Sequence, residues 1–312
     1  YILLTILSSL VFASCNYLGV DVNTSKYRRT LVFSTTDPYF TQDGISRTLD
    51  LYYRTAKPYQ HQGGDYELVT AGASVRFGVP FSENDTVFFG GGLQQTQIKS
   101  GTNIPAAYLA YAREFGDTSW SLPLTIGWSR DNRDSALAPN SGRYQRLNTE
   151  WAVAGDARYI RGNYQYQQYI PLNKQYTFAF NGELGLGKGM NGQPFPVFKN
   201  FYGGGLGSVR GFDQGTLGPR DVTGASLGGP KKITLNAELI APFPGAGNDR
   251  TLRWFAFVDA GNANDERELF KMNLGYGIGP RWKSPAGPIA VDLAYGQRDH
   301  RLRLQFAVAI AF

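Results

Sequence analysis

The last twelve residues, RLRLQFAVAIAF (301–312), alternate strictly between two kinds of side chain. Every even position, from Leu302 to Phe312, is apolar, whereas the odd positions carry two arginines, a glutamine and then alanines. A period of two over this length is typical of a β-strand with one apolar face. The end of the chain is therefore predicted to be such a strand.

The same alternation recurs upstream, in YTFAFNGELGL (176–186), KKITLNAELIA (231–241) and PIAVDLAYG (288–296). A soluble sandwich would carry many Lys and Glu on its exposed face, but here the second face holds mostly Gly, Ala, Asn, Thr or a lone carboxylate. Aromatic residues gather near the ends of the predicted strands: Tyr52, Tyr53, Phe88, Phe89, Trp120, Trp128, Trp151, Trp254 and Trp282. Lipid-facing strands with aromatic belts and a polar lumen have this distribution. The pattern favours an all-β, transmembrane antiparallel β-barrel.

The composition agrees with this fold class and excludes others. The 312 residues include 38 Gly, 20 Phe and 19 Tyr, and no run of 18 apolar residues that could form a membrane-spanning helix. The single Cys15 cannot form an intramolecular disulfide. The net charge is +6, but no nucleic-acid motif and no long Lys/Arg run accompanies it, so nucleic acid is not an expected partner.

The spacing of the alternating segments predicts about 14–16 strands over residues 16–312. Further strands are expected near 28–36, 45–55, 66–77, 85–98, 106–115, 118–129, 145–156, 158–170, 251–260 and 270–282. Short turns such as TDPYFTQDG (36–44) alternate with longer connections, and residues 187–230 form one long glycine-rich loop. A loop of that length in a compact domain is either disordered or functional.

Four stretches together resemble a known family: NTSKYRRTLVFSTTDPYFTQDGISR (23–47), FYGGGLGSVRGFDQGTLGP (201–219), LNAELIAPFPGA (235–246) and FAFVDAGN (255–262). With the closing aromatic residue, they resemble the barrel of the BamA family of outer-membrane protein assembly factors, from about Asn16 to Phe312. The resemblance implies that 187–230 is an extracellular loop that folds back into the lumen.

By the same resemblance, a motif in this loop anchors it there, formed by Val209, Arg210, Gly211 and Phe212. Arg210 would face carboxylates that match Glu238 and Asp259. The residues themselves support Glu238, which shares the polar face of its strand and could partner a buried arginine. Asp259 is less secure, because two phenylalanines share its face in strict alternation. An Arg210 on a solvated loop tip remains the alternative.

The resemblance also implies the activity: insertion of other β-barrel proteins into the bacterial outer membrane at a weakly paired seam between the first and last strands. An exposed strand edge can template an incoming strand. The last strand is expected to contain Gly296 and to carry Phe306 and Phe312. Its N-terminal half is expected to be interrupted by Asp299, His300, Arg301 and Arg303. The terminal Phe312 resembles the signal by which barrel proteins are delivered for assembly.

The implied partners are unfolded outer-membrane proteins, outer-membrane lipids and accessory lipoproteins, with no cofactor, metal or catalytic residue. Adjacent strand residues point to opposite faces, so Asp299 and His300 do not make a catalytic pair. Two other functions remain open. One is a two-partner secretion transporter of the same superfamily, and the other is a passive diffusion porin.

The beginning of the chain departs from the family pattern. By the resemblance we expect this sequence to lack counterparts of the periplasmic POTRA domains and of the first one or two barrel strands of the family. Residues 1–15 form an apolar segment with three interpretations: a lipid-modified Cys15, a replacement strand, or a truncated or rearranged chain end.

Overall fold

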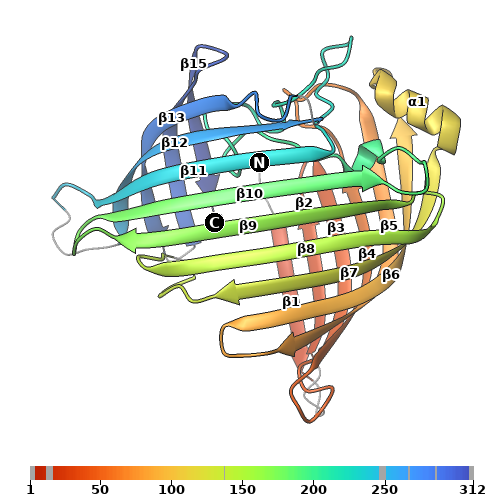
Figure 1. Ribbon diagram of the computed structural model, residues 1–312, viewed down its shortest axis with the longest axis horizontal. Helices are drawn as coiled ribbons and strands as arrows, with labels where there is room; N and C mark the ends of the chain where they lie inside the picture. The colour runs from red at the N-terminus through yellow and green to blue at the C-terminus, as the bar shows by residue number, and fades with distance from the viewer. Residues whose placement is uncertain are drawn as a thin grey trace.

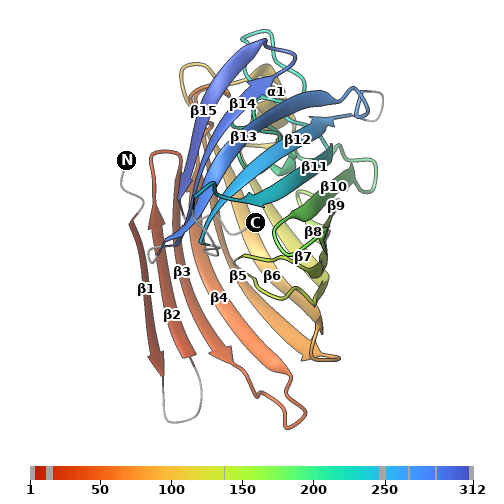
Figure 2. The same cartoon turned by 90° about the vertical axis from the view of Figure 1, so that its left-hand side faces the viewer.

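The computed structural model describes residues 4–11, 17–136, 138–245, 251–265, 268–284 and 287–308. Within these residues fifteen strands form one antiparallel sheet, in which each strand pairs with its neighbours in sequence, from β1 to β15. The sheet curls round on itself as an incomplete barrel (Figures 1 and 2). The strands are β1 (Leu4–Val11), β2 (Tyr17–Thr24), β3 (Arg28–Asp37), β4 (Ser46–Ala56), β5 (Tyr66–Pro80), β6 (Asp85–Ser100), β7 (Thr118–Asp131), β8 (Gly142–Gly155), β9 (Tyr159–Pro171), β10 (Thr177–Gly189), β11 (Lys231–Pro242), β12 (Leu252–Asn264), β13 (Asn273–Ser284), β14 (Gly287–Gly296) and β15 (Arg301–Val308).

Alternation separates an outer and an inner face, as the sequence predicts. On β12 the side chain of Val258 is 55% exposed on the outer face, and its neighbour Asp259 is fully buried on the inner face. On β15 the outward residues Leu302, Leu304 and Phe306 are 63%, 73% and 62% exposed. An apolar surface this extensive indicates contact with lipid. The predicted antiparallel all-β architecture of about 14–16 strands is confirmed.

The predicted strand near 106–115 is wrong, because Ala106–Phe115 forms helix α1. Tyr108, Tyr111 and Phe115 follow one another at helical spacing, and Pro105 precedes the first turn. Both tyrosines are buried in a cluster with Tyr66 of β5 and with β6. The aromatic residues of this segment therefore cover one end of the barrel instead of facing lipid. Among the described residues, no helix is long and apolar enough to span a bilayer.

The boundary between the last two strands also differs from the prediction. Gly296 is the final residue of β14 and pairs with Arg301, the first residue of β15. Asp299 and His300 lie in the turn between these strands, where His300 has a φ of 52°. Asp299 and His300 therefore form a turn, whereas Arg301 and Arg303 lie within β15 and pair with β14, so the last strand is not interrupted. Phe312 lies outside the described residues.

Two other predicted segments have a definite structure. Leu4–Val11 pairs along its full length with β2, which corresponds to the strand interpretation of the apolar segment, whereas Cys15 lies outside the described residues. The long connection runs from 190 to 230, because β10 continues to Gly189. It contains a short helix η1 (Val197–Lys199) and three isolated bridges, among them Phe201 to Gly229, so it is a compact loop.

Candidate functional site

Arg210, in the middle of the long loop, lies against the inner face of the barrel and is 2% exposed. Its Nε and Nη2 donate to the two carboxylate oxygens of Asp259 at 2.7 Å each, and its backbone N–H donates to Asp259 at 2.9 Å. Its Nη1 lies 2.6 Å from Glu238 Oε1. The structure thus brings the arginine together with both carboxylates that the sequence singled out. The planar guanidinium matches a carboxylate in this bidentate way, which a lysine cannot do.

The two phenylalanines that share the face of Asp259 also point inward and stack on arginines. The guanidinium carbon of Arg210 lies 3.6 Å from the ring centroid of Phe257, and that of Arg281 lies 4.0 Å from the centroid of Phe255. The ring face attracts the cation. Aromatic residues on the inner face are therefore part of the site. The presence of two phenylalanines on the same face does not argue against Asp259 as a partner of Arg210.

Glu238 serves two arginines, because Arg281 of β13 donates to it at 2.9 Å. A third carboxylate, Asp292 of β14, is fully buried with an oxygen 3.9 Å from Arg210 Nη1. Burial lowers the pKa of Arg210, but the charges of Glu238 and Asp259 outweigh this and raise it above its usual value. The arginine therefore stays charged. Among the described residues, no cluster of His, Cys, Asp or Glu could hold a metal ion.

Glycines allow the loop to come this close to the wall. A Cβ added at Gly275 of β13 would overlap the carbonyl oxygen of Arg210, and one added at Gly296 would overlap the carbonyl oxygen of Gly211. Gly211 itself has a φ of 88°, which favours glycine. The flanking Val209 and Phe212 are completely buried. The four residues of the motif are thus fitted between β12, β13 and β14.

The first half of the same loop is held at another part of the wall. Lys199 donates to Glu150 of β8 at 2.7 Å, and Tyr159 of β9 donates to the same carboxylate. Burial lowers the pKa of Lys199 more than the neighbouring Glu150 raises it. The hydroxyl of Tyr202 lies 3.0 Å from that of Tyr108 in α1. The loop therefore crosses the lumen and is bound on both sides.

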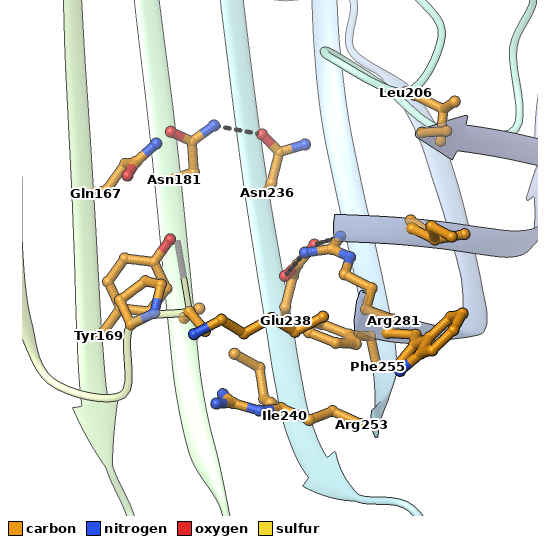
Figure 3. Close-up of a pocket in the computed structure, with 18 of the residues that line it drawn as sticks. Gln167, Tyr169, Asn181, Leu206, Asn236, Glu238, Ile240, Arg253, Phe255 and Arg281 are labelled. Atoms are coloured by element: carbon orange, nitrogen blue, oxygen red, sulfur yellow. Dashed lines mark hydrogen bonds and ion pairs between the residues drawn. The ribbon is translucent and has the colours of Figure 1, made fainter. Parts of the chain in front are cut away.

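A cavity of about 120 Å³ lies beside the Arg210 cluster. Figure 3 shows the pair of Glu238 and Arg281 at its wall, and Asn181 donating to Asn236 on the neighbouring strand. Asn236 also donates to the carbonyl oxygen of Ser208 in the loop, at 2.7 Å. Polar side chains of β10 and β11 thus extend the contact between the wall and the loop.

Sequence reasoning missed Arg281, Asp292 and Gly275 as parts of this site. A signal was present for the glycine, since β13 carries glycines at 275, 277 and 279, all on one face of a strand. Glycine in a strand interior often marks the close approach of another backbone. The sequence places Asp292 on the polar face of its strand. Alternation alone does not show which charged side chain a buried carboxylate will lie beside.

An antiparallel sheet with an apolar outer face, a polar inner face and a loop bound inside defines an outer-membrane β-barrel with an occupied lumen. The profile of the Omp85 superfamily domain matches residues 12–312. The chain belongs to the Omp85 superfamily, which is not a family of enzymes.

Two relatives described as outer membrane protein assembly factor BamA support the resemblance seen in the sequence. BamA of Neisseria meningitidis serogroup B is 34% identical over 89% of this chain and 41% of its own length. BamA of Nitratidesulfovibrio vulgaris is 28% identical over 94% of this chain and 36% of its own length. The resemblance to the BamA family is confirmed. This chain spans about two fifths of the length of these relatives.

Solved structures show the same fold. BamA from Haemophilus ducreyi lacking POTRA domains 1–3 superposes with a TM-score of 0.87 at 22% identity, covering 94% of this chain and 63% of that one. CdiB from Acinetobacter baumannii gives a TM-score of 0.55 at 14% identity, covering 93% of this chain and 52% of that one. The predicted barrel fold is confirmed. The location in the bacterial outer membrane is supported by the two BamA relatives.

Proposed function

We propose that this barrel assembles other β-barrel proteins and inserts them into the outer membrane at the seam between β1 and β15. The observation that carries the proposal is the open sheet. Among the described residues, β15 pairs only with β14 and β1 pairs only with β2. Each of these strands therefore has one edge whose backbone groups find no ladder partner in the described part of the chain.

Such an edge can bind a further strand by main-chain hydrogen bonds, whatever the side chains of that strand. Backbone groups that lack a partner in the hydrocarbon region of a bilayer cost several kcal/mol each, on the order of the values for buried polar groups. An incoming strand that satisfies them is stabilised in return. No covalent bond is made or broken, so the activity needs no catalytic residue.

The partners follow from this activity. Unfolded outer-membrane proteins are the clients, and lipids contact the outer face, where Leu304 and Phe306 are exposed. Accessory lipoproteins are implied by the family resemblance alone. They would bind parts of the protein outside the barrel. Of the two rival functions, the passive porin is disfavoured because the loop from 190 to 230 lies across the lumen. The two-partner secretion transporter is disfavoured by the 34% identity to BamA over 89% of this chain.

The proposal is tested by reconstitution. The chain, and in parallel the product of its whole gene, is placed in liposomes with a urea-unfolded client barrel, and folding is followed by the heat-modifiable mobility of the client. We expect faster client folding than in protein-free liposomes and in liposomes that hold an unrelated porin. Equal folding rates in all three would overturn the proposed function.

A further inference from the structure

Two side chains on the inner face of β15 bind the loop at the residues that follow Arg210. Arg303 donates to the carbonyl oxygen of Gly211 at 2.6 Å and to the carboxylate of Asp213 at 3.0 Å and 3.3 Å. The arginine side chain is only 13% exposed. A charge-assisted pair in such a setting is stronger than one on an open surface.

Gln305, the next inward residue of the strand, completes the contact. Its side-chain carbonyl accepts the backbone N–H of Gly211 at 3.1 Å, and its amide donates to the carbonyl oxygen of Phe212 at 2.9 Å. The loop backbone at Gly211 and Phe212 is therefore satisfied by the last strand. Sheet neighbours normally supply such hydrogen bonds, but here side chains do so.

We propose that Arg303 and Gln305 are positioning residues that clamp the last strand to the loop, so that the loop, and not β1, holds β15 in place. The consequence for client insertion rests on the proposed function. The clamp itself does not, because it concerns only the position of β15.

The placement of the clamp supports this assignment. Among the described residues β15 has one strand neighbour, β14. The hydrogen bonds from its side chains to the loop are therefore a large part of the contacts that hold β15 in place. Arg303 also donates to Asp299 in the preceding turn at 3.0 Å, which joins turn, strand and loop through one guanidinium. Oδ1 of Asp213 also lies 3.9 Å from Nδ1 of His61, which is in the connection between β4 and β5.

The clamp is directly coupled to the Arg210 cluster. Asp259 of β12 binds the backbone N–H of Arg210, and Gln305 of β15 binds the backbone N–H of Gly211. Consecutive peptide groups of one loop thus connect two strands that are not neighbours in the sheet. A shift of the loop backbone would therefore change the contact with β15 as well as the contact with β12, because the two N–H groups belong to adjacent residues.

The clamp is tested by amide hydrogen exchange of the whole chain in lipid nanodiscs, without any client. We expect Arg303→Ala and Gln305→Ala to speed the exchange of β15 amides by about tenfold, the effect of losing one or two hydrogen bonds. Asp213→Asn, which changes the loop and leaves β15 intact, should produce the same change at β15. Arg303→Lys should restore part of the protection, since a point charge can still reach Asp213.

Arg301→Ala is the matched control, because Arg301 lies on the same strand and inward face but is exposed. We expect it to leave β15 exchange unchanged. The clamp would be overturned if the β15 amides of both Arg303→Ala and Asp213→Asn exchanged at the wild-type rate. It would also be overturned if Arg301→Ala had an equal effect, or if the amides of β10 and β11 exchanged faster to the same extent as those of β15. Capture of a client is measured separately. Faster β15 exchange without any change in capture would leave the clamp standing and would count against the proposed seam.

Discussion

At the scale of single residues, one buried arginine, Arg210, is shared by carboxylates of three strands. Asp259 carries more of the interaction than Glu238, because it accepts two guanidinium bonds and one backbone bond from Arg210. Glu238 accepts a second arginine, Arg281, and keeps it when Arg210 is lost. The sequence indicated both carboxylates but ranked them in the opposite order. It could not show that Phe257 faces inward as the stacking partner of the guanidinium.

Removal of the arginine or its main partner should release the loop. In Arg210→Ala the buried Asp259 loses its arginine, and in Asp259→Asn the arginine loses its bidentate partner and keeps only Glu238, so each change should destabilise the bound loop by about 3–5 kcal/mol. Glu238→Gln should cost about 1–3 kcal/mol, because Arg210 retains Asp259. The measurement is chymotryptic cleavage after Phe212, which is fully buried in the intact site.

A double-mutant cycle of Arg210→Ala with Glu238→Gln separates the pair from general damage to the barrel. The coupling should be clearly different from zero, since the two groups lie 2.6 Å apart. Additive effects, or a loop as protected in Arg210→Ala as in the wild type, would show that the arginine does not anchor the loop.

Gly275 provides a steric test of the same contact. Gly275→Ala places a methyl group on the carbonyl oxygen of Arg210 and should displace the loop, at a cost of about 1–3 kcal/mol for overpacking. Gly207→Ala, in the same loop, is the control because a Cβ there meets no atom within 4 Å. Cleavage after Phe212 should rise in the first variant only. Equal cleavage in the two variants would contradict the close approach.

At the scale of elements, strict alternation made the strands predictable. Period two is a local property, so the strands around 178, 235 and 304 could be recognised from the sequence alone. The abundance of aromatic residues near helix α1 favours an interfacial strand, but the spacing of Tyr108 and Tyr111 by three residues indicates one face of a helix, and the spacing is the better guide. The extent of the last two strands depended on a turn at His300, whose positive φ has no clear sequence signal.

The terminal aromatic residue, Phe312, is expected to increase the amount of the chain that is inserted into the membrane. Phe312→Ala should lower the membrane yield of the chain more than Phe306→Ala, because Phe312 resembles a delivery signal and Phe306 only adds apolar area on the outer face. The measurement compares the amounts of folded, membrane-inserted protein in cells that express the two variants. Equal yields would leave interfacial anchoring as the sole role of Phe312.

At the scale of the whole molecule, the loop that crosses the lumen separates this barrel from an open pore. It is bound to β8 through Lys199 and to β11 and β12 through Arg210. The resemblance in the sequence implied a loop in the lumen, but not that it is held at both ends. The contact between Lys199 and Glu150 could not be predicted from the sequence. Glu150 is distant in sequence, and it lies on a mostly polar face of its strand, where nothing singles it out.

The occupied lumen should limit conductance. In planar bilayers we expect small, flickering channels from the intact chain, and large, steady ones after residues 202–228 are replaced by a two-residue turn. The replacement is structurally permitted because Phe201 and Gly229 already pair as an antiparallel bridge. Large, steady channels from the intact chain would contradict the occupied lumen and would favour a porin.

The central claim is that clients enter through the edge of β15. Cysteine cross-linking tests it most directly, in a Cys15→Ser background during insertion of a client that carries a cysteine in its terminal strand. Leu304→Cys, on β15, should form a disulfide with the client. Ile278→Cys should not, because this outward and 52% exposed residue belongs to β13, which is paired on both sides. Cross-links at both positions, or at neither while the client still folds, would contradict insertion at the β15 edge.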